Sequence, residues 1–470
     1  MGYKALVAKA HLSPHPNADK LKLVNINGYQ VVTGANLQEG QLVVFFPEGG
    51  QLSHEFVFEN SEYRAGKGTN KDPEKTGLFE ANRRVKTIRL RGQASEGYCV
   101  PVENLAFVGS LKGLTEGTTF TEINGHVICE KYIPQATREA IANRTKGDRQ
   151  VFTVEGFEKH FDTEQLRLFI NRIPEGAILY FTEKLHGTSG RTGYVKAPTE
   201  LTKWQSRWND FWHSFSGLVT RLWSLLYIIG IQPKLFKPLL TWQTISGSRN
   251  VTYRPGRSYG DSYREQAESL FRDKLLKGET IFYEIVGYTE SGNPLFSHGL
   301  GDRKDKDDVC GGLRKTYDTD RMEYSYGSEP KEHRVFVYRI TMTNEDGEVT
   351  ELPWSQVKAR CAQLGVQRVP QIGEPLVYGY MHQIAVWCDA CGQLEGKDSQ
   401  KEILLELAKV YSGGVSTLDK RHIREGICLR VEHPEVPPER SILKYKGFEF
   451  CHLEGIAKND DKYVDVEEVS

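Results

Sequence analysis

Residues 1–130 contain a series of short apolar runs that are broken by glycines and show no long helical period. The runs are rich in β-branched and aromatic residues: YKALVAKA, KLVNINGYQVVTG, GQLVVFFPEG, RRVKTIRLRG and EGYCVPV. Runs of this length between turn formers are typical of β-strands. About five strands without a long helix predict a small closed β-barrel, and the OB-fold is the leading candidate.

A connector and a second domain are predicted after the barrel. Pro134 and the polar stretch QATREAIANRTKGDRQ indicate a connector over residues 131–150. Residues 151–470 mix strand-like runs (AILYFT, TIFYEIVG, RVFVYRIT, GICLRVEH and SILKYK) with helices. Two helices show the spacing of a capping box, Ser262 with Glu265 and Ser399 with Glu402, and Gly278 and Gly413 stand where they would end. The chain is therefore expected to be α+β, with an OB-like barrel followed by a mixed α/β domain.

Two segments of the second domain differ from the rest. Residues 301–333 are crowded with charges and turn formers, which favours a surface loop. Residues 199–242 are rich in tryptophan, and Trp204, Trp208 and Trp212 share one face of a helix. We expect this insertion to be a helical hairpin on its own domain, or else a helix for a membrane surface or a partner. Arg221 and the run from Gly230 to Lys234 leave it too short to span a bilayer.

Composition restricts the function classes. There are 61 basic and 62 acidic residues, so any nucleic-acid partner must be held by local basic patches. The first residues, MGYKALVAKAHLS, lack the apolar core of a secretory signal, and 8 cysteines are too few for a disulfide scaffold. These features exclude a secreted mini-domain, a membrane-spanning protein and a histone-like protein. We expect a monomer in the cytoplasm or another reducing intracellular compartment.

The residues with chemical potential are lysines and glutamates on strand-like runs. Lys184 follows a strand-like segment in FTEKLHGTSGRTGYV, Glu284 interrupts IFYEIVG, and Glu425 precedes GICLRV. Lys444 and Lys446 alternate in SILKYKG and so share a face of a strand. Such groups suit a reaction on a nucleoside triphosphate: a neutral lysine attacks the α-phosphorus, pyrophosphate leaves, and cations neutralise the developing charge. Acidic residues such as Glu425 would hold Mg²⁺ or Mn²⁺.

Five motifs in order resemble those of the covalent nucleotidyltransferases. They are Lys184-Leu185-His186-Gly187-Thr188, Phe282-Tyr283-Glu284, Phe336-Val337-Tyr338-Arg339, Glu425-Gly426 and Lys444-Tyr445-Lys446. The His-Gly-Thr after the lysine is closest to the RNA-ligase branch, because DNA ligases usually have Asp-Gly there. An OB-like domain at the N-terminus is similar to the Deinococcus-type RNA ligases, as are RRVKTIRLRG and SEGYCVP.

This resemblance implies an ATP-dependent RNA ligase that seals RNA or an RNA-containing nicked duplex with Mg²⁺ or Mn²⁺. Lys184 would accept AMP, and AMP would pass to a 5′-phosphate that a 3′-hydroxyl then attacks. Glu425 would engage the metal, and Arg249 would contact the 5′-phosphate or nick. The nucleotide-binding residues would be His186 in the pocket lining, Glu284 at the ribose, Tyr338 (or, less favoured, Phe336) on adenine, and Lys444 and Lys446 at the α-phosphate.

Nucleic-acid binding has a separate candidate in the barrel. Five cations fall within nine residues: Arg83, Arg84, Lys86, Arg89 and Arg91. Such clusters contact phosphates without reading sequence, although a merely solvated face stays an alternative. Cys388 and Cys391 have zinc-knuckle spacing, but no second pair completes four ligands, so a structural zinc is not expected.

Three other functions stay open. A DNA ligase and an mRNA capping guanylyltransferase usually carry an OB domain after the last lysine motif. Only 470 − 446 = 24 residues follow Lys446, too few for a barrel, which disfavours both. The third alternative is a non-catalytic nucleic-acid-binding protein. The presence of Lys184, Glu284, Glu425, Lys444 and Lys446 disfavours it, because these are the groups that the reaction requires.

Overall fold

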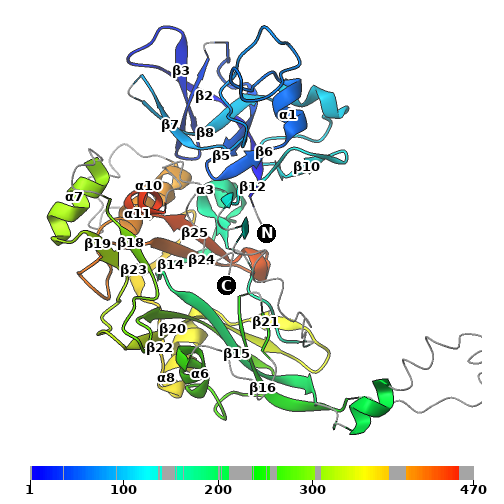
Figure 1. Ribbon diagram of the computed structural model, residues 1–470, viewed down its shortest axis with the longest axis vertical. Helices are drawn as coiled ribbons and strands as arrows, with labels where there is room; N and C mark the ends of the chain where they lie inside the picture. The colour runs from blue at the N-terminus through cyan, green and yellow to red at the C-terminus, as the bar shows by residue number, and fades with distance from the viewer. Residues whose placement is uncertain are drawn as a thin grey trace, which may run out of the picture.

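The barrel strands pair as their alternating patterns require. The computed structural model describes residues 3–34, 36–91, 93–135, 138–139, 154, 156–161, 163–199, 202, 204–210, 236, 238–249, 251–253, 262–301, 308–380 and 399–454. One sheet has the order β7-β8-β5-β1-β9, a second has the order β2-β3-β4, and β4 lies alongside β8. These strands form the blue part at the top of Figure 1. Asn27 and Gly28, with φ of +48° and +81°, form the two-residue turn of the β3–β4 hairpin.

The elements of this N-terminal part are the following. The strands are β1 (Ala5–Lys9), β2 (His11–Pro14), β3 (Leu21–Ile26), β4 (Tyr29–Gly34), β5 (Leu42–Pro47), β6 (Gly50–Leu52), β7 (Thr87–Leu90), β8 (Gln93–Pro101), β9 (Thr119–Phe120), β10 (Glu122–Ile123), β11 (His126–Val127) and β12 (Cys129–Lys131). The helices are α1 (His54–Glu59) and the 3₁₀ helix η1 (Val102–Val108).

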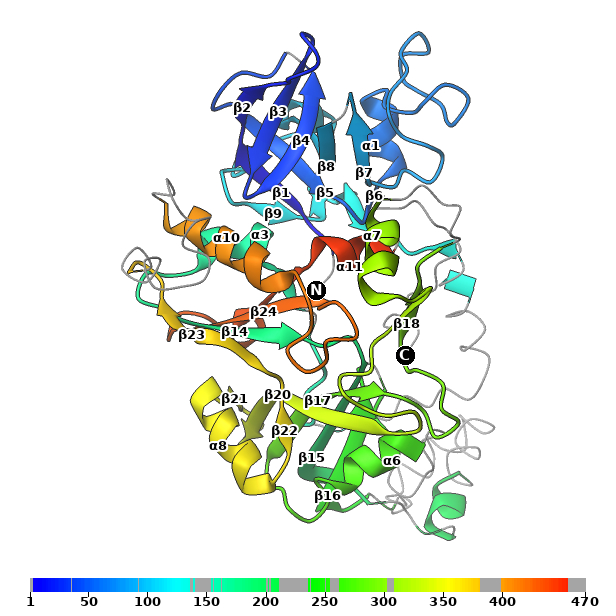
Figure 2. The same cartoon turned by 90° about the vertical axis from the view of Figure 1, so that its left-hand side faces the viewer.

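Two further sheets build the second part. One has the order β13-β25-β24-β14-β23, and the other has the order β16-β15-β17-β20-β21 with β22 beside β20. Figure 2 shows α10 and α3 between the barrel and the first of these sheets. The strands are β13 (Glu164–Gln165), β14 (Ile178–Lys184), β15 (Thr188–Pro198), β16 (Leu240–Ser248), β17 (Glu279–Gly287), β18 (Ser297–Gly299), β19 (Arg321–Glu323), β20 (His333–Thr343), β21 (Val349–Glu351), β22 (Gln367–Arg368), β23 (Gln371–Val377), β24 (Gly426–Glu432) and β25 (Ile442–Lys446).

The helices of the second part are mostly short. They are α3 (Leu166–Phe169), η2 (Ile170–Arg172), α6 (Ser262–Ser269), α7 (Asp308–Tyr317), α8 (Trp354–Leu364), α10 (Gln400–Ser412), η5 (Pro438–Arg440) and α11 (Phe448–Leu453). Ser399 and Gly413 occupy the N-cap and C-cap positions of α10 as predicted, but the Ser399 side chain makes no capping hydrogen bond. Among the described residues, every helix is too short or too polar to cross a membrane.

One hydrophobic core joins the barrel to the five-stranded sheet of the second part. It contains Leu6 and Phe45 of the barrel, Leu404 of α10, and Phe181 and Leu429 of the sheet, each exposed by no more than 1%. Period-2 alternation explains how β1 serves two cores, because Leu6 and Ala8 face this one while Ala5 and Val7 face a second core under α1. The barrel is therefore packed onto the sheet that carries Lys184.

Three expectations need correction. Residues 301–333 are not a loop throughout, because α7 and β19 lie within them and Cys310, Leu313 and Met322 of these elements are buried. The helix that begins near Ser262 ends at Ser269, well before Gly278, so Gly278 does not cap it. The insertion predicted for 199–242 ends earlier, because Leu240 to Trp242 belong to β16.

Other predictions lie wholly or partly outside the described residues. Residues 204–210 are helical, and the rings of Trp204 and Trp208 stack with centroids 5.9 Å apart, as a shared helical face requires. Trp212, most of the insertion, most of the 131–150 connector, and the Cys388–Cys391 pair lie outside the described part of the chain.

Candidate active site

A cavity lies between the two sheets of the second part, and Lys184 stands on its wall at the end of β14. Strand alternation selects the side chains on this wall: Thr182 and Lys184 of β14, Cys428 and Arg430 of β24, and Ile442, Lys444 and Lys446 of β25 all line the cavity. The residues between them, such as Phe181 and Leu429, face the shared core. Lys444 and Lys446 share a face, as the sequence predicts.

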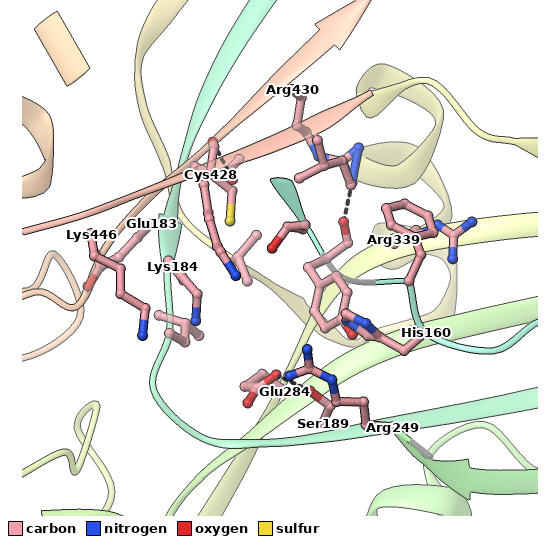
Figure 3. Close-up of a pocket in the computed structure, with 18 residues that line it drawn as sticks. His160, Glu183, Lys184, Ser189, Arg249, Glu284, Arg339, Cys428, Arg430 and Lys446 are labelled. Atoms are coloured by element: carbon pink, nitrogen blue, oxygen red, sulfur yellow. Dashed lines mark hydrogen bonds between the residues drawn. The ribbon is translucent and has the colours of Figure 1, made fainter. Parts of the chain in front are cut away.

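Strand register brings the two terminal lysines together. Lys184 pairs with Gly426, and Gly426 pairs with Lys446, so the three residues form one row across the sheet. Figure 3 shows Lys184 and Lys446 side by side. The row requires glycine in its middle, because a Cβ on Gly426 would lie 2.3 Å from the Tyr445 carbonyl oxygen and 2.7 Å from Lys446 Cα.

Glu425 provides the negative charge between these lysines. Its side chain is 0% exposed, and Oε1 lies 2.6 Å from Lys184 Nζ and 3.5 Å from Lys446 Nζ. Lys446 Nζ also donates to both oxygens of Glu454, at 2.8 and 2.6 Å, just after α11. A buried carboxylate is stable only with such partners, so Glu425 fixes the directions of both ammonium groups.

The opposite wall comes from the second sheet. Ser189 of β15 donates to Glu284 Oε2 of β17 at 3.1 Å, and both residues line the cavity with Tyr338 and Arg249 (Figure 3). Arg249 follows β16 and also borders a cleft of about 1190 Å³ between the barrel and the second part. The cavity and the cleft therefore share Arg249, Lys444 and Lys446.

A β-bulge decides which aromatic residue of β20 faces the cavity. The register with β17 moves from Phe282↔Arg339 to Tyr283↔Val337, so Tyr338 is the extra residue. Tyr338 lines the cavity, whereas Phe336 is 1% exposed within a hydrophobic core. Burial raises the pKa of the Tyr338 hydroxyl above its usual value, and the nearby Glu284 adds to that rise. The ring is neutral at physiological pH and suited to stacking.

His186 lies behind the cavity instead of on its surface. It is 3% exposed, and Nδ1 is 3.7 Å from Glu425 Oε2. Its ring packs against Phe296, Tyr324 and Phe450 with centroids 4.5 to 4.9 Å apart. His186, Glu425 and Glu454 each offer a ligand atom, all within 4.8 Å of one another, so the donor set can accept a divalent cation.

The basic cluster of the barrel is separate from this cavity. Arg83 Nε donates to the Leu52 carbonyl at 2.9 Å, and the Arg84 guanidinium lies 4.7 Å from the centre of the Tyr132 ring. Arg84 borders the cleft, Lys86 is half-buried, and Arg91 is exposed. Arg89 lies on β7, with its side chain outside the described part.

Sequence reasoning missed several residues of the site. His160 and Phe161 line the cavity from the segment before β13, and the His160 ring meets Tyr338 edge-on at 5.7 Å. Arg430, also on the wall, donates to the Tyr338 carbonyl. Period-2 alternation along β24, from Gly426 through Cys428 to Arg430, could have found Arg430, whereas His160 has no signal in the sequence.

Two family models match this chain, one over the barrel and one over the second part. An OB-fold domain model matches residues 5–102, ahead of a part in which a lysine-bearing cavity lies between two mixed, mainly antiparallel sheets. With the RNA ligase model that matches this second part, the class is a nucleotidyltransferase with an N-terminal OB-fold. The RNA ligase family model matches residues 177–446, more than half of the chain. The protein therefore belongs to the RNA ligase family, and it is an enzyme of that family.

Solved structures agree on the fold. An alanine variant of Naegleria gruberi RNA ligase with ATP and Mn is 16% identical, with a TM-score of 0.52 and coverage of 97% of this chain and 99% of that one. A methionine variant with AMP and Mn gives 14%, 0.53, 95% and 98%, and the ligase with pyrophosphate gives 14%, 0.51, 95% and 97%. At these identities the likeness establishes the fold. A search of curated proteins finds no match.

Proposed function

We propose that the protein is an ATP-dependent RNA ligase that joins a 3′-hydroxyl to a 5′-phosphate through a covalent lysyl-AMP intermediate. The observation that carries the proposal is the row Lys184, Gly426 and Lys446, with buried Glu425 beside both lysines, at one end of the cavity. Membership of the RNA ligase family supports the reaction type, and the ATP, AMP and Mn of the Naegleria gruberi structures support these ligands.

The first step is a phosphoryl transfer at Lys184. Lys184 first gives the proton of its ammonium form to solvent, and the neutral Nζ attacks the α-phosphorus of ATP. A P–N bond forms, the bond to the β-phosphate oxygen breaks, pyrophosphate leaves with that electron pair, and Nζ releases a second proton to solvent. Lys444 and Lys446 neutralise charge on the α-phosphate, Glu284 holds the ribose, and Tyr338 stacks on adenine. His186 supports the pocket from behind Glu425.

The chain's residues also suit a divalent metal. Glu425 would hold Mg²⁺ or Mn²⁺ through its hard carboxylate oxygens, and the ion would supply positive charge beside the reacting phosphate. The donor set fits such an ion, because the ligand atoms of His186, Glu425 and Glu454 all lie within 4.8 Å of one another. His186 and Glu454 could add ligand atoms.

The next two steps act on RNA. AMP passes from Lys184 to a 5′-phosphate held by Arg249, and the 3′-hydroxyl then attacks that phosphate and releases AMP. We assign residues 1–130 to an RNA-binding barrel, 131–150 to a connector and 151–470 to the catalytic part. The barrel would bind RNA or an RNA-containing nicked duplex through Arg83, Arg84, Lys86, Arg89 and Arg91, and the whole would act as a monomer.

A sealing assay tests the reaction. Duplexes with one 3′-OH/5′-phosphate nick are offered with either RNA or DNA at the 3′-hydroxyl side, together with ATP and Mg²⁺ or Mn²⁺. The proposal predicts a joined product that depends on ATP and forms fastest with an RNA 3′-end. Sealing only of all-DNA nicks would identify a DNA ligase, and binding without sealing would identify a non-catalytic protein.

A further inference from the structure

Tyr326 has a strained backbone conformation, and its side chain contacts the residues that follow Lys184. Its side chain is 0% exposed, and its φ is +49°, a left-handed value that residues other than glycine rarely adopt. Gly327 follows with φ of +78°. Strain of this kind persists only where the surroundings enforce it, and it is concentrated at functional sites.

Asp419 and its neighbours enforce this conformation. Asp419 Oδ2 accepts from Ser325 Oγ at 2.5 Å and from the Gly327 N–H at 2.9 Å. These two bonds fix the backbone on both sides of Tyr326. Arg421 Nε in turn donates to both oxygens of Asp419 at 3.1 Å, so the carboxylate is held in place.

His422 also holds the backbone at Tyr326 in place. The Tyr326 N–H donates to His422 Nε2 at 3.2 Å. His422 Nδ1 lies 2.9 Å from the Ile423 carbonyl, which can only accept, so Nδ1 carries the proton and Nε2 is the acceptor. Burial lowers the pKa of His422, which keeps the ring in this neutral form, and the ring packs edge-on against Tyr326 at 4.5 Å.

The bonds from Asp419 and His422 hold the Tyr326 hydroxyl against the backbone of residues 185–187, which follow Lys184 and are called the nucleophile segment below. The His186 N–H donates to Tyr326 Oη at 2.6 Å. The next residue, Gly187, approaches β17 closely, because a Cβ there would lie 2.4 Å from the Ile285 carbonyl oxygen. The chain between Lys184 and β15 is therefore held at His186 by Tyr326 and at Gly187 by β17.

We propose that Tyr326 is a positioning residue for adenylylation. By accepting the His186 N–H, it sets the direction of the Leu185–Gly187 turn and hence of Lys184 Nζ toward the α-phosphate. It does not touch the cavity itself, whose lining residues do not include it. The proposal rests on the proposed function, in which Lys184 is the nucleophile.

The test compares two tyrosine-to-phenylalanine variants in single-turnover formation of the enzyme–AMP adduct. Tyr326→Phe removes the acceptor of the His186 N–H. Tyr288→Phe is the matched control, because Tyr288 is also buried, at 6% exposed, and its hydroxyl donates to Glu323 Oε2 at 2.9 Å and not to the nucleophile segment. Each variant is measured across ATP concentrations and by thermal unfolding.

We expect Tyr326→Phe to lower the maximal adenylylation rate at least ten-fold, with less than a two-fold change in half-saturating ATP. Tyr288→Phe should retain the wild-type rate at a similar loss of thermal midpoint. Equal maximal rates in the two variants would overturn the proposal. If Tyr326→Phe does not fold, Asp419→Asn decides, with a smaller rate loss expected and an unchanged rate contradicting it. Failure of the wild type to form any adduct would instead reject the proposed function.

Discussion

At the scale of single residues, the site depends on how two lysine ammonium groups share one buried carboxylate. Glu425 is fully buried, whereas Lys184 and Lys446 are 16% and 15% exposed, so only the lysines have access to a bound nucleotide. The candidate residues Lys184, Glu284, Lys444 and Lys446 could be predicted from motif order. The motif favoured Tyr338 over Phe336 without excluding Phe336, because the bulge that turns Tyr338 inward depends on the register between β17 and β20.

Replacing Glu425 by glutamine should expose the two ammonium groups to each other. We expect Glu425→Gln to reduce adenylylation at least 100-fold and to lower the free energy of unfolding by about 1–3 kcal/mol, since a buried charged partner is lost. Label transfer and urea denaturation measure the two effects. Glu374→Gln, an exposed position on β23, is the control, and identical behaviour of the two variants would refute this role.

At the scale of elements, the close approach of β24 and β25 places the lysines. The strands themselves were predictable from branched and aromatic runs. The helix and strand within residues 301–333 could not be predicted, because the many charges of this segment obscured the buried Cys310 and Leu313 of α7 and Met322 of β19. Tyr326 lies in that same stretch, so its contact with His186 could be found only from the fold.

The β24–β25 contact is tested at Gly426. We expect Gly426→Ala to push the strands apart, to cost about 1–3 kcal/mol of stability as overpacking does, and to lower adenylylation several-fold by moving Lys446. The comparison is Gly299→Ala on β18, where an added Cβ has nothing within 4 Å. Denaturation and label transfer of both variants provide the measurement. Full activity of Gly426→Ala would show that the reaction does not require the close approach of β24 and β25 at Gly426.

At the scale of the whole molecule, the barrel and the catalytic part meet around Arg167. Its guanidinium donates to Tyr445 Oη at 2.6 Å, lies 3.5 Å from Glu96, and stacks over Tyr29 with 4.4 Å to the ring centre. Tyr445 stands between the two lysines of β25, so the barrel contacts the catalytic strand through Arg167 of α3. Sequence patterns predicted a barrel and a second part, but the core that they share depends on long-range packing that no local pattern encodes.

This interface predicts a pH effect through Glu48, which borders the same cleft. Burial raises the pKa of Glu48 from 4.5 to about 7, and Glu96 opposes its ionisation as well. Because the pKa of Glu48 is higher in the folded than in the unfolded protein, the contribution of Glu48 to the free energy of unfolding is greatest below pH 4.5. This contribution is lost as the pH rises through 7. Glu48→Gln should remove this fall, which has a slope of at most about 1.4 kcal/mol per pH unit.

Unfolding by urea at several values between pH 5 and 8 measures the effect. The exposed Glu103 of the same barrel provides the control, since Glu103→Gln should keep the wild-type pH dependence. Parallel curves for wild type and Glu48→Gln would show that Glu48 does not titrate in this range.

The most direct test of the account is transfer of label from nucleotide to Lys184. The protein, first freed of bound AMP with pyrophosphate, is incubated with α-labelled ATP or GTP and Mg²⁺ or Mn²⁺, denatured, and digested to locate the label. We predict label from ATP alone, on the peptide that contains Lys184, and none in Lys184→Arg, which keeps a positive charge beside Glu425. Label from GTP would indicate a capping enzyme. No label from either nucleotide in the folded wild-type protein would contradict the central claim that Lys184 is a nucleotide-accepting nucleophile.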